Sequence, residues 1–256
     1  MAVEHSNAHQ QKHFTTRAFD SLICITAPAS FIELAEATLI GWRFIEQKSS
    51  LAKIDIIVSY RDNLFHVDST VLDNSKVVDD LLDALNEFFL CLSYLVANKT
   101  QEFSLLHCAS YTEAGKNIIL LGGKKSGKSA KTLSKAIAGE LIYADDLLLW
   151  HAKRGVFVTL GLPLRLRRAM ISLIDGDTIK DKFIIGKNIL YSHQKFFNNA
   201  KLGNEFSLDQ LKLMGENFDF AIKDIPVHKT LFYLKQHLIA DNFISIKKKS
   251  IKSKFL

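Results

Sequence analysis

The chain has 256 residues, of which 48% are hydrophobic and 23% are charged, and it carries a formal net charge of +6. This composition excludes an intrinsically disordered or fibrous protein and predicts a globular protein with a substantial buried core. The positive charge favours an anionic partner, such as a nucleotide phosphate or an acidic peptide. The sequence has no basic patch interleaved with aromatic residues, so we expect no nucleic-acid partner.

The N-terminal end, the apolar stretches and the cysteines bear on cellular location. Residues 1–12 are polar and rich in Gln, Asn and His, which predicts a disordered leader rather than a signal peptide. The most apolar stretch, residues 88–97, is too short to cross a bilayer. Cys24, Cys91 and Cys108 are widely separated among apolar residues, which favours core packing in a reducing compartment. We therefore expect a cytoplasmic protein with no membrane partner.

Residues 13–102 have the pattern of a small α+β module that ends at a polar break. A stretch of ambiguous pattern, residues 31–45, fits either a helix or a strand. The other expected elements are a strand over residues 22–26, a hairpin of residues 54–60 and 64–68, and a helix over residues 77–96 that begins near Asn74 and Ser75.

Residues 103–240 are expected to form the main domain, followed by a basic tail over residues 241–256. The segment 172–202 is polar and weakly patterned, which favours a mobile or substrate-facing region. The expected strands are residues 103–111, 117–121, 141–144, 147–150, 156–160, 161–168, 218–222 and 230–234, with one helix over residues 129–138 closed by Gly139.

A glycine-rich loop between strand 117–121 and helix 129–138 matches the phosphate-loop pattern G-x-x-x-x-G-K-[ST] without a mismatch. Glycines let successive backbone N–H groups point at phosphate oxygens, and the helix start adds partial positive charge. We expect Lys128 to reach the phosphates of ATP and Ser129 to ligate Mg²⁺. A glycine turn that only joins strand to helix is the alternative. The expected nucleotide-binding residues are Gly122, Gly123, Lys124, Lys125, Ser126, Gly127, Lys128, Ser129 and Ala130.

Two adjacent acids, Asp145 and Asp146, follow the next predicted strand along the chain. A phosphate-loop protein needs a carboxylate at this place to hold Mg²⁺. Neighbouring side chains of a strand face opposite ways, so both acids reach the nucleotide only if the strand ends there, which the turn preference of Asp favours. The second carboxylate is then free to take a proton from an attacking hydroxyl. An ordinary turn is the alternative.

Three further residues are weaker candidates. The strand of His107 precedes the loop strand and could place the imidazole beside the γ-phosphate, although a lone histidine in an apolar strand is more often a core residue. Arg165 and Arg167 share one face of their predicted strand and suit phosphate or an acidic substrate, with plain surface solvation as the alternative.

The stretch Leu106-His107-Cys108-Ala109, the loop and Ala144-Asp145-Asp146 together resemble the catalytic domain of HPr kinase/phosphorylase. The chain is still more similar to the looser group of HPr-kinase-related proteins, which includes kinases of lasso-peptide precursors. In that group a Pro-containing, arginine-rich strand like residues 162–167 follows the Asp pair. The glutamate-bearing, glycine-rich signature of true HPr kinases is missing, so we do not expect HPr as the substrate or phosphorylase activity.

The resemblance implies an α/β fold with a phosphoenolpyruvate-carboxykinase-like P-loop core of mixed sheet, preceded by the small N-terminal module. It implies that Lys128 and Ser129 bind phosphate and Mg²⁺ and that Asp146 is the catalytic base, with His107 beside it. Asp145 is then the metal-linked acid.

The sequence therefore predicts an ATP- and Mg²⁺-dependent serine kinase that acts on a peptide or small protein. A small-molecule kinase on the same fold and a nucleotide-binding regulatory module without transfer activity remain as alternatives. A homo-oligomer is compatible with the sequence.

Overall fold

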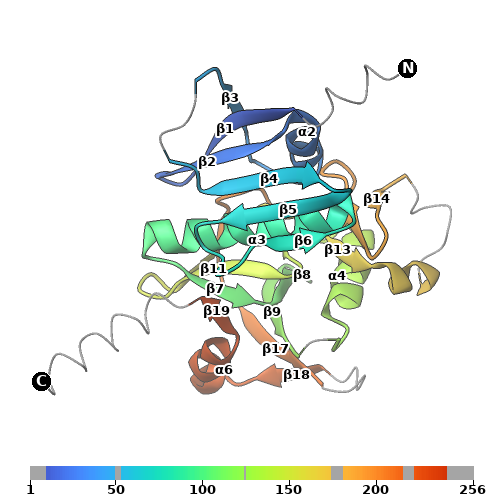
Figure 1. Cartoon of the computed structure of the whole chain (residues 1–256). Helices are drawn as coiled ribbons and strands as arrows, with labels where there is room; N and C mark the ends of the chain where they lie inside the picture. Colours follow the sequence, from blue (N-terminus) through green and yellow to red (C-terminus); the bar gives the residue numbers. More distant parts are fainter. Residues whose placement is uncertain (1–9, 50–52, 124, 174–180, 216–221, 241–256) are drawn as a thin grey trace, which may run out of the picture.

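The structure is a computed structural model that describes residues 10–49, 53–123, 125–173, 181–215 and 222–240. Within these residues the chain forms a mixed α/β fold of four β-sheets and four α-helices (Figure 1). Most of the expected leader, all of the expected tail and Lys124 of the loop lie outside the described residues. The first strand begins at Gln11, within the stretch predicted as a leader.

A six-stranded sheet built from the N-terminal residues lies at the top of Figure 1. Its order is β3-β1-β2-β4-β5-β6, and all its pairs are antiparallel except β2 with β4. The predicted hairpin is confirmed as β4 and β5, and the ambiguous stretch contains a helix, α2 (Ala29–Thr38). The strands are β1 (Gln11–Ala18), β2 (Ser21–Pro28), β3 (Ile45–Gln47), β4 (Ile56–Arg61), β5 (Leu64–Ser69) and β6 (Lys76–Val78).

The long helix α3 spans Leu81–Thr100, so the predicted start near Asn74 and Ser75 is wrong. Residues 76–78 form β6 instead, where the β-branched Val77 and Val78 pair with β5. The Asp80 side chain accepts hydrogen bonds from the Leu82 and Asp83 N–H groups, and this N-cap fixes where the helix begins.

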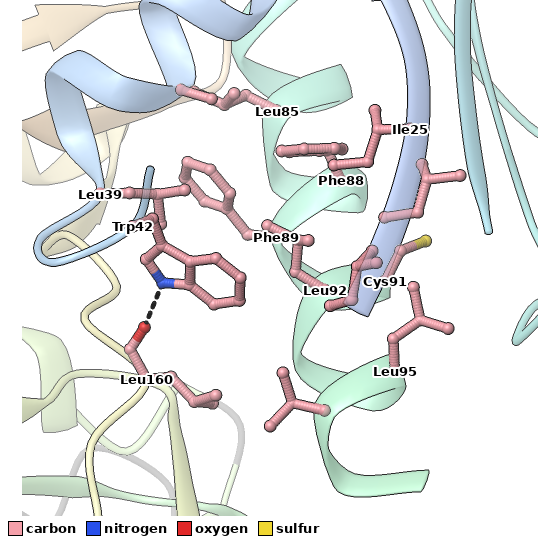
Figure 2. Close-up of a cluster of buried hydrophobic side chains, with 14 of the residues drawn as sticks. Ile25, Leu39, Trp42, Leu85, Phe88, Phe89, Cys91, Leu92, Leu95 and Leu160 are labelled. Atoms are coloured by element: carbon pink, nitrogen blue, oxygen red, sulfur yellow. Dashed lines mark hydrogen bonds between the residues drawn. The ribbon is translucent and has the colours of Figure 1, made fainter. Parts of the chain in front are cut away.

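Helix α3 lies between the six-stranded sheet and the rest of the molecule (Figure 1). With 20 residues, α3 is long and apolar enough to cross a membrane. The prediction that the apolar stretch is too short to do so, which considered residues 88–97 alone, is therefore wrong. However, 61% of the most apolar window of α3 is buried inside the fold, and a buried core helix passes the same test. Figure 2 shows Leu85, Phe88, Leu92 and Leu95 of α3 packed in one apolar cluster.

One hydrophobic cluster crosses the predicted boundary at residue 102. It joins α3 and the N-terminal sheet to Leu105, Leu149 and Leu160 of the following domain. The Trp42 indole N–H donates to the Leu160 carbonyl at 2.7 Å (Figure 2). The two predicted parts therefore share a core, and their division into domains stays a prediction.

Three smaller sheets make up the rest of the fold. One contains β10-β8-β9-β17-β18, the second β16-β12-β11-β7-β19, and the third β13-β15-β14. Helix α4 (Lys128–Ile137) packs on β8, and a short helix, α6 (Thr230–Gln236), lies near the C-terminal end. The strands are β7 (Ser104–His107), β8 (Ala109–Glu113), β9 (Lys116–Leu121), β10 (Ile142–Ala144), β11 (Leu147–His151), β12 (Val156–Val158), β13 (Arg165–Arg167), β14 (Phe183–Ile185), β15 (Ile189–Ser192), β16 (Glu205–Ser207), β17 (Gln210–Met214), β18 (Ile222–Ile225) and β19 (Leu238–Ala240).

Several expectations for this part are wrong. The apolar run 103–111 is two strands in different sheets, because the chain leaves one sheet at Cys108 and enters the other. Residues 230–234 are helical rather than extended, and a five-residue apolar run cannot distinguish the two by pattern. The segment 172–202, predicted as weakly patterned, contains the paired strands β14 and β15, and its role as a mobile or substrate-facing region stays a prediction. Residues 174–180, and residues 218–221 of a predicted strand, lie outside the described residues.

Candidate active site

The topology of the sheet around β9 brings the candidate residues to one edge. Strands β9 and β10 both pair antiparallel with β8, so they run in the same direction, and their carboxyl ends meet at that edge. The loop leaves β9 there, and Asp145 and Asp146 leave β10 there. Because β8 runs the other way, His107 and Cys108, which precede it, lie at the same edge. The strand that carries the acids ends at Ala144, as predicted.

The loop backbone is in the left-handed region at two of its described residues. Gly127, the N-cap of α4, has a φ of 100°, and Lys125 has a φ of 63°. A Cβ atom on Gly122 would lie 2.7 Å from the Ser126 Oγ, so a side chain at this position would require the Ser126 side chain to move. Gly123 faces open space. The loop is therefore tightly packed at Gly122 and open at Gly123, and such a tight turn is compatible with phosphate binding by backbone N–H groups.

Lys128, at the first position of α4, is folded back onto the loop. Its Nζ donates to the Gly122 carbonyl at 2.7 Å and to the Gly123 carbonyl at 3.1 Å. Burial lowers the pKa of this ammonium group, although the charges of Asp146 and Asp145 act to raise it. The ammonium group of Lys128 thus interacts electrostatically with both aspartates. Its hydrogen bonds to the two loop carbonyls can be replaced by hydrogen bonds to phosphate oxygens.

Asp146 is held between two basic side chains. The His107 Nε2 donates to its Oδ1 at 3.0 Å, and the Arg165 Nη2 lies 3.3 Å from its Oδ2. Burial alone raises the pKa of Asp146, but the hydrogen bond from His107 and the charge of Arg165 outweigh it and lower this pKa below its usual value. The carboxylate is therefore ionised, fixed in orientation and only partly covered, as a proton acceptor must be.

Asp145 is almost fully buried, and burial together with the charge of Asp146 raises its pKa to about 6. The Oδ2 atom of Asp145 accepts a hydrogen bond from the backbone N–H of Arg165 at 3.1 Å. Its Oδ1 has no hydrogen-bond partner in the part of the chain that the structure describes, since the nearby Thr132 hydroxyl donates to the Lys128 carbonyl at 3.0 Å. A buried carboxylate oxygen without a partner costs stability, which makes it a candidate ligand.

Ser129 and Asp145, the two residues predicted to ligate Mg²⁺, have oxygen atoms of the kind that this ion prefers. The half-buried Ser129 lies in the first turn of α4, and hydroxyl and carboxylate oxygens are ligands that this ion prefers. Within the described ranges, no three His, Cys, Asp or Glu side chains gather around one metal position. Nucleotide-bound Mg²⁺ needs only one or two carboxylates beside phosphate oxygens.

Arg165 belongs to the site, whereas no hydrogen bond or ion pair joins Arg167 to these residues in the described part of the chain. Besides meeting Asp146, Arg165 donates from Nη1 to the Asn86 Oδ1 at 2.7 Å. The Tyr191 hydroxyl donates to the same oxygen at 3.1 Å. Arg167 is exposed two residues further along β13. Sequence reasoning missed Asn86 and Tyr191, although Asn86 is a polar residue four positions from Leu82 and Leu90 of an otherwise apolar helix face.

A small pocket opens beside Asp146, between α3 and the segment that leads into β13. It has a volume of about 100 Å³. Its lining residues are Asn86, Phe89, Leu90, Asp146, Leu147, Leu162, Pro163, Arg165 and Tyr191. A larger cavity of about 330 Å³ lies at β4 and β5 of the N-terminal sheet, but three of its lining residues are acidic and none is basic, which does not suit phosphate.

A comparison of the chain with models of known protein families gives no match, and a comparison with curated proteins gives none either.

Proposed function

We propose that this chain is an ATP-dependent serine kinase that phosphorylates a peptide or small protein. The observation that carries the proposal is the meeting of the loop, the Asp145–Asp146 pair and His107 at one sheet edge, with a pocket open beside Asp146. Phosphoryl transfer depends mainly on positioning and electrostatics, and these residues supply both.

In the proposed reaction, Lys128 exchanges the Gly122 and Gly123 carbonyls for phosphate oxygens of ATP. The acceptor hydroxyl gives its proton to the Asp146 carboxylate as its oxygen bonds to the γ-phosphorus. The bond between that phosphorus and the bridging oxygen breaks, and ADP leaves. Before this step, His107 and Arg165 keep Asp146 ionised and hold its carboxylate in position.

Ser129 and Asp145 would hold the Mg²⁺ ion. When bound, the ion neutralises charge that develops on the phosphate oxygens. A need for Asp145 as a ligand also explains why the fold keeps a buried carboxylate whose pKa is raised.

The proposal includes membership of the HPr-kinase-related group, with its phosphoenolpyruvate-carboxykinase-like core. The order of β9, loop, α4, β10 and acid pair supports it, as does the arginine-bearing strand β13 that follows. We place the protein in the cytoplasm, where ATP and Mg²⁺ are available.

The proposal is tested with γ-labelled ATP, Mg²⁺ and a serine-peptide library, comparing the wild type with Asp146→Asn. The amide keeps the shape of the carboxylate but cannot take the proton, so transfer should fall by about 10²-fold or more. Calorimetry should show that ATP still binds. Asp224→Asn, a change on the exposed edge strand β18, is the matched control and should keep wild-type transfer.

Two outcomes would count against the proposal. If Asp146→Asn transfers phosphate at the wild-type rate, Asp146 is not the base. If the wild type binds ATP and labels no serine peptide, the chain is better described as a nucleotide-binding regulatory module.

A further inference from the structure

The pocket beside Asp146 has a polar end and an apolar end. At the polar end lie Asp146, Arg165 and Asn86, which are joined by the contacts described above. The remaining walls are largely apolar and come from both predicted domains: Phe89 and Leu90 from α3, Leu147 from β11, and Leu162 and Pro163 before β13.

The charges at the polar end are already compensated. The guanidinium group of Arg165 is shared between Asp146 and the amide oxygen of Asn86. An acidic side chain in this pocket would have to compete with Asp146 for Arg165 and would lie close to a carboxylate of the same sign. The pocket therefore disfavours an acidic group, even though Arg165 by itself suggests one.

The apolar walls are well fixed. Phe89 and Tyr191 pack edge to face with ring centroids 5.3 Å apart, and the Tyr191 hydroxyl is anchored on Asn86. A dry cavity of about 150 Å³ holds a benzene ring. A pocket of about 100 Å³ therefore favours a branched aliphatic group over a larger aromatic ring.

We propose that this pocket binds an aliphatic side chain next to the phosphorylated serine. The inference rests on the proposed kinase function and narrows its substrate class to peptides in which Val, Ile or Leu flanks the serine. With the aliphatic group against Phe89, Leu90 and Leu162, the neighbouring serine hydroxyl lies at the polar end beside Asp146.

The test uses serine peptides that are identical except for the residue before or after the serine, which is Gly, Val, Leu, Phe or Glu. The wild type should prefer Val or Leu over Gly and Glu by at least about tenfold in kcat/KM on one side of the serine, the discrimination that one or two methylene groups give in an apolar pocket.

Two changes at the half-buried Leu90 alter the pocket in opposite directions. Leu90→Trp fills it and should remove the preference for Val and Leu, whereas Leu90→Ala enlarges it and should shift the preference toward Phe. Neither should change MgATP affinity. Leu231→Trp, at an exposed position of α6, is the matched control and should keep the wild-type preference.

The outcomes separate the two proposals. Transfer without any preference, a preference for Glu, or an unchanged preference in both Leu90 variants would overturn the pocket inference and leave the kinase standing. ATP binding without transfer to any peptide would overturn the kinase proposal, and the pocket inference with it.

Discussion

The loop after β9 and the pocket beside Asp146 are both close to the acid pair, but they are built differently. The loop side is local: Gly122, Ser126 and Lys128 contact one another within a single strand–helix connection. The pocket side is assembled over long distances, because Arg165 meets an asparagine 79 positions earlier and the walls come from α3, β11, β13 and β15.

Under the proposed function, this difference follows from what each side would recognise. Phosphate is bound mainly by backbone N–H groups and one cation, which a short glycine-rich segment can supply alone. An acceptor is recognised by the shape and polarity of a pocket, which requires side chains from several elements. Damage to the packing between the N-terminal sheet and the core should therefore affect the pocket more than the loop.

Gly161→Ala is the change expected to disturb that packing most. Gly161 has a φ of 63°, its carbonyl accepts a hydrogen bond from the Ile40 N–H, and an added Cβ would lie 2.1 Å from the Ile40 carbonyl oxygen. Overpacking against backbone, added to left-handed strain, should lower the free energy of unfolding by about 3 kcal/mol or more. Urea unfolding measures the loss.

Gly155→Ala is the matched control. Gly155 also has a positive φ, 67°, but an added Cβ would meet nothing within 4 Å. It should therefore lose only the strain of the left-handed backbone, about 1–2 kcal/mol. Equal losses in the two variants would show that the close approach to Ile40 does not hold the two parts together.

Asp145→Asn tests the residue that lies between the two sides. The pKa of Asp145 is raised to about 6 in the folded state. Between about pH 4 and 6, Asp145 therefore keeps its proton in the folded state but has lost it in the unfolded state. Wild-type stability should therefore fall as the pH rises through this window, and the penalty should be complete above it. The amide does not titrate, so the variant should be more stable than the wild type by about 2 kcal/mol at pH 8.

The measurement is the melting temperature of both proteins from pH 4.5 to pH 8. The advantage of Asp145→Asn should shrink toward pH 4.5. If Asp145→Asn is less stable than the wild type at pH 8, the ionised carboxylate of Asp145 does not destabilise the folded state.

Asn86→Ala is expected to give the smallest effect, confined to the pocket side. Without the amide oxygen, Arg165 loses one of its two partners and holds Asp146 less firmly, so the pKa of Asp146 should rise toward its usual value. The acid limb of the transfer rate should therefore move to higher pH. MgATP affinity should not change.

Asn188→Ala is the control for this variant, because Asn188 also joins α3 to the three-stranded sheet, through Asp83, but away from Asp146. An unchanged pH profile in Asn86→Ala, or an equal shift in Asn188→Ala, would remove the positioning role from Asn86.

The same contrast explains what the sequence could predict. The loop, β9, α4 and the end of β10 before the acids depend on neighbouring residues, and all four were predicted close to their observed bounds. Asn86 and Tyr191 could not be placed, because their proximity to Arg165 depends on how α3 packs against β15. β17, the parallel neighbour of β9, was missed, although the alternation in Gln210–Met214 is a signal for it.

The central claim, that the loop after β9 binds nucleotide, is tested most directly by calorimetry of MgATP with the wild type, Lys128→Ala and Lys116→Ala. Lys116 carries the same charge at the other end of β9, where it is exposed. We expect Lys128→Ala to weaken ATP binding by about 10²-fold, since a charge-assisted contact contributes roughly 1.5–3 kcal/mol, and Lys116→Ala to bind ATP as the wild type does. Equal ATP affinity in all three folded proteins would contradict the claim.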